Sequence, residues 1–207
     1  SPMLVAHGAS YMNHSSAAFF GVLAVYLGLR ARDGGRAWAL GAGCAVTAMA
    51  AVRPLSALAV MGVVAAGIWL DAADRRWRAA LRSALPLWGL AVLGGLPLLL
   101  AHLGYNQEAF GGPLTFGYEA LWGPSHGLGF HLDPYGNRYG VVEAILFTSA
   151  DLSTLNLNLL EIPIPLVLVV GLHLLLRRGS LPVGEGILIL WALLPVFGNL
   201  FYWHHGY

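Results

Sequence analysis

Long apolar runs alternate with short polar loops along most of this 207-residue chain. The length of each run is close to the ~20 residues that an α-helix needs to cross the hydrocarbon core of a bilayer. We therefore predict an all-α, polytopic membrane protein with about six transmembrane helices, two of which are short and meet at Arg53-Pro54. The predicted spans are 14–29, 37–52, 55–70, 84–103, 159–176 and 186–202.

Arginines mark one side of this predicted membrane protein. Nine of the eleven basic residues fall in three loops between apolar runs, and the chain contains no lysine. Basic loops stay on the cytoplasmic side of a membrane, so we expect 30–36, 71–83 and 177–185 to be cytoplasmic. The segments 104–158 and 203–207 are then external.

The composition supports this class. The chain is 57% hydrophobic and 10% charged, whereas soluble domains average about 25% charged residues. The net charge of +1 gives no reason to expect a nucleic-acid partner, and the single cysteine, Cys44, excludes an intrachain disulfide. The absence of lysine, together with abundant Ala, Gly and Leu, indicates a bacterial source. We expect a multi-pass protein of the bacterial inner (plasma) membrane whose active face is external.

We interpret residues 1–207 as a single membrane domain that is a fragment of a longer chain, with 104–158 as its external loop. Apolar positions 141, 142, 145 and 146 within 139–147 give that part of the loop one apolar face, which is typical of a helix lying along the outer interface. The Arg-rich segment 71–83 has a helical pattern as well. It is either a helix on the inner membrane surface or a solvated loop with an aromatic anchor.

Arg53-Pro54 interrupts two apolar runs, and an arginine near a bilayer is costly enough to call for a reason. It directly precedes a helix that begins with Pro54. The N–H groups of 55–57, the helix dipole and the guanidinium would converge on one point, which is suited to a phosphate. The alternative is an arginine that extends its head group to the interface and marks a turn.

The external side holds most of the titratable residues, including six of the ten acidic side chains. We expect a polar substrate to be bound there by Glu119, His126, His131 and Asp133, with Tyr118, Trp122 and Phe130 as stacking surfaces. His204 and His205 are further candidates for substrate contact, or they pack at the interface. His126, His131 and Asp133 have metal-ligand chemistry, but no fourth ligand stands at a diagnostic spacing, so we expect no metal cofactor.

Several motifs in their order along the chain resemble bacterial integral-membrane glycosyltransferases of the GT-C class, relatives of the protein mannosyltransferases and of the lipid A aminoarabinose transferase. The resemblance covers nearly all of the chain. The motifs are Tyr11-Met12-Asn13-His14-Ser15, Arg53-Pro54-Leu55, Tyr105-Asn106, Phe110-Gly111-Gly112-Pro113-Leu114, Gly123-Pro124-Ser125-His126-Gly127-Leu128-Gly129-Phe130 and Phe201-Tyr202-Trp203-His204-His205-Gly206.

This resemblance implies a helical membrane enzyme that moves a sugar from a polyprenyl-phosphate donor to an external acceptor, which is a cell-envelope glycan, lipid or protein. In that class an acidic residue in the first external loop is the catalytic base. The matching loop belongs upstream of residue 1, so the resemblance assigns the catalytic role to no residue of this chain. Donor-phosphate binding by Arg53 is our own inference from its chemistry.

Two other functions remain open at this point. One is a flippase or transporter of lipid-linked sugars, in which broken helices come in pairs across two halves of the protein. The sequence has a single such break, at Arg53-Pro54. The other is a non-catalytic membrane scaffold. An acidic residue in an external loop that precedes this segment would favour the transferase.

The predicted topology is tested with Gly34→Cys, Ser125→Cys and Ser180→Cys, each on a Cys44→Ala background. A membrane-impermeant maleimide added to intact cells should label the cysteine at 125 and leave those at 34 and 180 unlabelled, because only the first lies outside. Labelling at 34 or 180 but not at 125 would reverse the orientation.

Overall fold

All regular elements that the structure describes are helices. The computed structural model describes residues 14–70, 77–115, 117–123, 129–133, 135–157, 166–177 and 183–201. The β-type pairing within them is one bridge between Leu132 and Arg138, so the all-α prediction is confirmed for this part. The helices are α2 (His14–Arg32), α3 (Arg36–Val52), α4 (Pro54–Leu70), α5 (Trp77–Phe110), α6 (Gly117–Trp122), α7 (Val141–Leu155), α8 (Leu166–Leu176) and α9 (Val183–Asn199).

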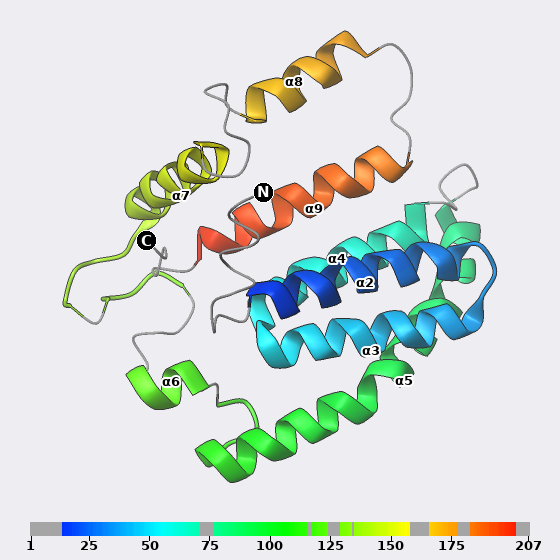
Figure 1. Cartoon of the computed structure of the whole chain (residues 1–207), viewed down its shortest axis with the longest axis horizontal. Coiled ribbons are helices and arrows are strands. Elements are labelled where there is room, and N and C mark those ends of the chain that lie inside the picture. Colours follow the sequence, from blue (N-terminus) through cyan, green and yellow to red (C-terminus); the bar gives the residue numbers. More distant parts are fainter. Residues whose placement is uncertain are drawn as a thin grey trace.

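Five helices form a bundle around a core of small side chains. Helices α2, α3 and α4 run back and forth, α5 crosses α3, and α9 lies along α4 (Figure 1). Helices α6 and α7 lie beyond one end of the bundle, and α8 lies on the outer side of α9 (Figure 1). The core consists largely of alanines and valines, such as Ala24, Ala42 and Val63. Small residues let helix backbones approach closely, as is common between membrane helices.

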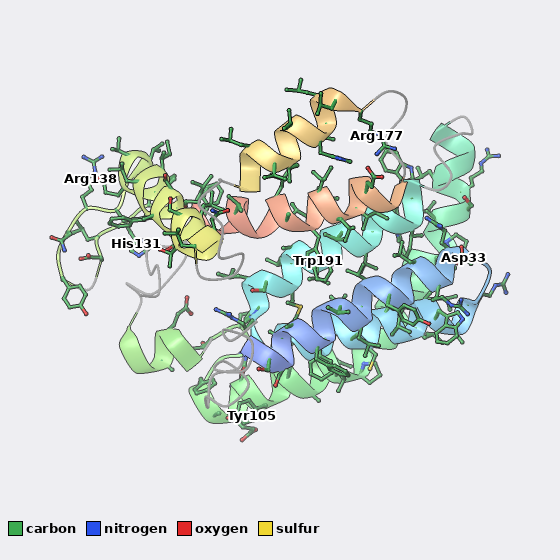
Figure 2. All side chains as sticks on the ribbon, turned by 45° about the horizontal axis from the view of Figure 1, so that its top comes forward. Asp33, Tyr105, His131, Arg138, Arg177 and Trp191 are labelled. Carbon is green, nitrogen blue, oxygen red and sulfur yellow. The ribbon has the colours of Figure 1, made fainter. Side chains whose placement is uncertain are left out.

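The register of the helices places the arginines at one end of the bundle. Gly67 of α4 packs against Leu29 of α2 and Ile187 of α9, so the end of α2, the end of α4 and the start of α9 lie together. We call this the arginine end and the opposite end the Arg53 end. Figure 2 shows Asp33 and Arg177 at the first and His131 and Arg138 at the second. The arginines of the arginine end whose side chains are described are Arg30, Arg32, Arg36, Arg82 and Arg177.

One described helix is both long and apolar enough to cross a bilayer. It is the Leu81–Phe110 part of α5, and only 11% of its apolar window is buried inside the protein. Helices α3, α4 and α9 are apolar but have 17 residues each, about 25 Å at 1.5 Å per residue and short of a ~30 Å hydrocarbon core. The helices thus follow the predicted apolar runs, but the prediction of six spans is not confirmed.

Helix α5 is longer than the predicted span 84–103 at both ends. Residues 77–83, which we expected in a separate surface segment, belong to this helix; the rest of that segment, 71–76, lies outside the described residues. The helix continues to Phe110 and ends where Gly111 adopts a φ of 78° and donates its N–H to Gln107 O at 3.1 Å. Positive φ is typical of glycine just after a helix. Residues 104–110, which we expected in the loop that follows the span, therefore belong to the helix.

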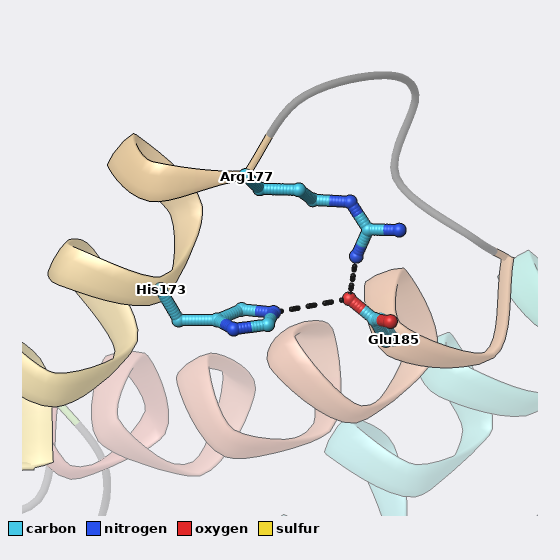
Figure 3. Close-up of polar contacts among 3 residues, drawn as sticks. All are labelled: His173, Arg177 and Glu185. Carbon is cyan, nitrogen blue, oxygen red and sulfur yellow. Dashed lines mark hydrogen bonds and ion pairs between the residues drawn. The ribbon is translucent and has the colours of Figure 1, made fainter.

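Helix α8 is joined to α9 by a polar contact at the arginine end. Glu185 in the first turn of α9 forms an ion pair with Arg177, and its Oε2 lies 3.2 Å from His173 Nε2 (Figure 3). His173 and Arg177 are four residues apart, so both lie on one face of the chain as α8 ends. The predicted span 159–176 is described only from Leu166 onward.

A close backbone contact joins α3 to α5. A Cβ atom on Gly94 of α5 would overlap the carbonyl oxygen of Leu40, and one on Gly43 of α3 would overlap that of Ala91. Because these neighbours are backbone atoms, no side-chain rotation relieves the overlap. Both positions therefore require glycine, and together they set how closely α5 lies to α3.

We expect Gly94→Ala to destabilise the bundle by about 1–3 kcal/mol, since overpacking forces the backbones apart. Gly104→Ala is the matched control in the same helix, because a Cβ there meets nothing within 4 Å. Both changes raise helix propensity by about 1 kcal/mol, so a difference between them reports the interhelical contact. Thermal unfolding in detergent, followed by circular dichroism, measures it; equal melting temperatures would contradict a close α3–α5 contact.

Candidate functional site

The junction of α3 and α4 is built by one residue, Arg53. It has φ −146° and ψ 87°, outside the helical region, because the following Pro54 disfavours a helical conformation in the residue before it. Its N–H donates to Met49 O at 2.7 Å, and its carbonyl accepts from Ala57 N at 3.0 Å. Arg53 thus ends α3 and begins α4, and the predicted break between two short helices is confirmed.

This hydrogen bonding corrects one part of the predicted anion site. Ala57 N–H, which we expected to be open, is taken up by Arg53 O. Proline has no N–H, so Leu55 and Ser56 carry the N–H groups of the first turn of α4 that have no partner within the helix. The half-buried Arg53 side chain starts at this turn, at the end opposite the clustered arginines. The junction therefore offers a guanidinium, two N–H groups and the positive end of a helix dipole.

Asp133 organises a tight turn at the same end. Its Oδ1 accepts from the N–H groups of Tyr135 at 2.9 Å and Asn137 at 2.7 Å, and its Oδ2 accepts from Asn137 Nδ2 at 3.0 Å. Backbone bonds from Asp133 N to Asn137 O and from Tyr139 N to His131 O close the turn. The predicted substrate residue Asp133 thus has its carboxylate engaged in holding the 131–139 loop.

These bonds change the acidity of Asp133. Desolvation raises the pKa of its carboxyl, but hydrogen bonds from the Asn137 side chain and from the N–H groups of Asn137, Tyr135 and Gly136 outweigh that effect, and the pKa lies below its ordinary value of 3.8. Hydrogen bonds to a carboxylate favour its charged form. The turn is therefore held by an ionised carboxylate at neutral pH.

Four aromatic rings connect this loop to α7 and to the end of α9. Phe130 lies 6.0 Å from Tyr139 and 5.7 Å from Phe201, and Tyr139 stacks on Phe147 of α7 at 6.2 Å. Tyr139 OH also donates to Leu200 O at 3.2 Å, and Gly129 N donates to Phe201 O at 2.8 Å. The ring of Phe130, which we predicted as a stacking surface for substrate, thus packs within this cluster while remaining 48% exposed.

Helix α7 has its faces reversed relative to a helix in a water-soluble protein. Val142, Ile145 and Leu146 are 64%, 58% and 61% exposed, whereas Thr148 is only 4% exposed. A surface helix in water buries its apolar face and exposes its polar one. The one-faced helix predicted from 139–147 is confirmed, and the structure adds that its apolar face points away from the protein.

The inner face of α7 is polar. Ala144, Thr148 and Asp151 follow one another at helical spacing; Thr148 is buried, and Asp151 is half-buried. Thr148 Oγ1 has no hydrogen-bond partner among the described residues. Burial raises the pKa of the Tyr139 phenol, and the negative charge of Asp151 raises it further. Sequence reasoning counted Asp151 among the six external acids but not among the site residues, and it did not identify Thr148.

The other predicted site residues are only partly brought together. His131 lies in the loop held by Asp133, and its Nδ1 is 2.9 Å from Gly129 O. Glu119 is on α6, and no described residue forms a hydrogen bond or ion pair with its carboxylate. His126, His204 and His205 lie outside the described residues, as do the side chains of Tyr118 and Trp122.

The described residues contain no group of three or more His, Cys, Asp or Glu side chains placed to hold a metal ion. The backbones of His131 and Asp133, which we considered as metal ligands, form hydrogen bonds with Tyr139 and Asn137 of the same loop. What the Arg53 end does offer is one cation at a helix start, an inward-facing carboxylate and exposed aromatic surface. Such groups bind anions and hydroxyl-bearing molecules.

Comparisons with protein-family models, with curated proteins and with solved structures find no match to this chain. The function is therefore argued from the residues and their arrangement.

We expect Asp133→Ala to loosen the 131–139 turn, whereas Asp133→Asn keeps part of it, because an amide oxygen still accepts hydrogen bonds. Since the folded pKa of Asp133 is below 3.8, the stabilisation is complete above the unfolded pKa and is lost as pH falls through the folded one. Hydrogen-exchange mass spectrometry should show reduced protection of the Tyr135 and Asn137 amides in Asp133→Ala. In the native protein the same amides should lose protection only below about pH 4. Unchanged protection in Asp133→Ala would contradict this role.

Proposed function

We propose that this chain is the multi-pass membrane domain of a GT-C type glycosyltransferase in the bacterial inner membrane. In this proposal its external Arg53 end binds a polyprenyl-phosphate sugar, which is transferred to an acceptor outside the cell. The observation that favours this function most is that two features lie at the same end of the protein. One is the cation Arg53 at the start of α4, and the other is helix α7, whose apolar face points outward and whose polar face points inward. A substrate with a phosphate, a sugar and a lipid tail matches the cation, the polar face and the apolar face.

Immersion in a bilayer is supported by the exposure of apolar side chains. Val92, Leu93 and Leu100 of α5 are 68%, 59% and 59% exposed, and Leu175 of α8 is 83% exposed. Soluble monomers rarely expose contiguous apolar patches beyond a few hundred Å². The separation of the described arginines toward one end agrees with a cytoplasmic arginine end and an external Arg53 end.

Phosphate binding is supported by the Arg53 junction. A guanidinium forms paired hydrogen bonds with phosphate oxygens and keeps its charge at all relevant pH values. The open N–H groups of Leu55 and Ser56 at the start of α4 add two donors beside it. In this arrangement the phosphate lies at the depth of the external interface, where a lipid phosphate group resides.

Sugar binding is supported by the inner face of α7 and the aromatic cluster. Thr148 and Asp151 present a hydroxyl and a carboxylate toward the protein, and both groups accept hydrogen bonds from hydroxyls. The partly exposed ring of Phe130 supplies an apolar surface in the same region. We assign hydroxyl recognition to Asp151 in addition to the sequence-predicted residues Glu119, His126, His131, Asp133, His204 and His205.

The transfer itself forms a bond between an acceptor oxygen and the anomeric carbon and breaks the bond from that carbon to the donor phosphate oxygen. The leaving polyprenyl phosphate gains negative charge, which a fixed cation at Arg53 stabilises. The acceptor hydroxyl must lose its proton to a base within hydrogen-bond reach. We assign that base to no residue of this chain.

A transporter of lipid-linked sugars is the alternative, and one observation weighs against it. Paired broken helices are typical of transporter repeats, yet α9 continues without a break from Val183 to Asn199 through Pro195. The break at Arg53 therefore has no counterpart in the described part of α8 and α9.

We expect Arg53→Ala to weaken binding of a polyprenyl-phosphate sugar by about 1.5–3 kcal/mol, the scale of a hydrogen bond to a charged group and roughly ten- to hundredfold in affinity. Arg53→Lys should restore part of it, because a point charge replaces a planar fork. Arg138→Ala is the control, an exposed arginine at the same end.

Binding is measured by titrating a short-chain polyprenyl-phosphate sugar into the purified protein in detergent, with melting temperature as the check on folding. Unchanged affinity in folded Arg53→Ala, or an equal loss in Arg138→Ala, would sink the phosphate assignment. In the active transferase, Asp151→Asn should lower turnover more than donor affinity if Asp151 orients the sugar or acceptor.

A further inference from the structure

An apolar groove runs along α5 near the arginine end of the bundle, far from the proposed sugar site. It is an open hollow of about 660 Å³ lined by Arg36, Pro86, Gly89, Leu90, Val92 and Leu93. Apart from the first residue of α3, Arg36, the whole lining comes from α5. The groove thus combines one cationic residue with a wall of apolar side chains.

The groove has room at its centre because the α5 residue there, Gly89, has no side chain. A Cβ on Gly89 would meet nothing within 4 Å, so no part of the described protein fills the space above this residue. The neighbouring Val92 and Leu93 are 68% and 59% exposed and form its wall. Trp88 faces the other way and donates its Nε1–H to Ala65 O of α4 at 3.3 Å. An apolar groove on a helix that is largely unburied is suited to binding an apolar ligand.

The positive charges beside the groove favour a ligand with an anionic head group. Arg36 and Arg82 are exposed, and neither forms a hydrogen bond or ion pair with a described residue. Arg82 precedes Pro86 by one helical turn, so it lies on the same side of α5. The other described arginines of this loop region have contacts: Arg30 lies 5.5 Å from the Trp38 ring centre, and Arg32 is 3.5 Å from Asp33 Oδ1.

We propose that this groove is a binding site for an anionic phospholipid of the leaflet at the arginine end. Its phosphate is bound by Arg36 and Arg82, and one acyl chain lies along α5 from Pro86 to Leu93, about 10 Å at 1.5 Å per residue. Arginine is well suited to phosphate because of its planar set of donors, and basic residues beside a membrane attract anionic lipids. This site is separate from the donor site at the Arg53 end.

The test is native mass spectrometry of the purified chain in detergent, titrated with phosphatidylglycerol or with phosphatidylcholine. The native protein should retain phosphatidylglycerol preferentially. Arg36→Gln should reduce its retention about fivefold, the effect of one basic group on an anionic lipid, and leave phosphatidylcholine unchanged. Gly89→Leu, which fills the groove, should reduce retention of both lipids. Gly104→Leu on the same helix, where a Cβ also meets nothing within 4 Å, is the control and should change neither.

Retention of phosphatidylglycerol that is the same in Arg36→Gln and in Gly89→Leu as in the native protein would overturn the proposal. So would a dimer mass in the native protein that Gly89→Leu abolishes, because the groove would then hold a second copy of the chain. Melting temperatures of all variants separate lost binding from lost folding, and Arg36→Gln, a change on the surface, keeps the test valid if Gly89→Leu unfolds.

Discussion

The contact between the backbones of α3 and α5 is the constraint on which the rest of the structure depends. Gly43 and Gly94 leave no room for a side chain between these helices, so α5 is held against the bundle by many weak contacts at short range rather than by large interlocking side chains. The long helix then carries two dissimilar regions. Near its start lies the apolar groove, and its far end leads into the polar segment that contains the candidate site.

The second organising feature is the break at Arg53-Pro54. Proline stops α3 and starts α4 with a single residue between them, which keeps the two short helices antiparallel. The N–H of that residue, Arg53, donates to Met49 O, and its carbonyl accepts from Ala57 N–H. The arginine is therefore fixed at one end of the bundle by the covalent geometry of the chain. Arg53 lies far from the other described arginines of the bundle for the same reason. Helices α2 and α3 are joined at the arginine end, whereas α3 and α4 are joined at the opposite end.

Sequence patterns predicted the helices well where apolar runs and breakers coincide. Helix α2 includes the predicted span 14–29, and the Arg53 junction was placed correctly. Hydropathy failed at the end of α5, because polar Gln107 and Glu108 end an apolar run without ending a helix. Periodicity found the apolar stripe of α7 but not that Thr148 and Asp151 face inward, since the sign of a face depends on whether water or lipid surrounds it. The Asp133 turn depends on hydrogen bonds that a spacing alone does not reveal.

The contacts at the end of α9 make that helix and the 129–139 loop one mechanical unit. Two hydrogen bonds and the ring of Phe201 join the loop to the residues that follow α9, while the start of the helix is tied to α8 through Glu185. With 17 residues the helix is about 25 Å long, and polar contacts hold it at both ends. A tilt of α9 against α4 at the arginine end would therefore also move Tyr139 and the loop at the Arg53 end of the bundle.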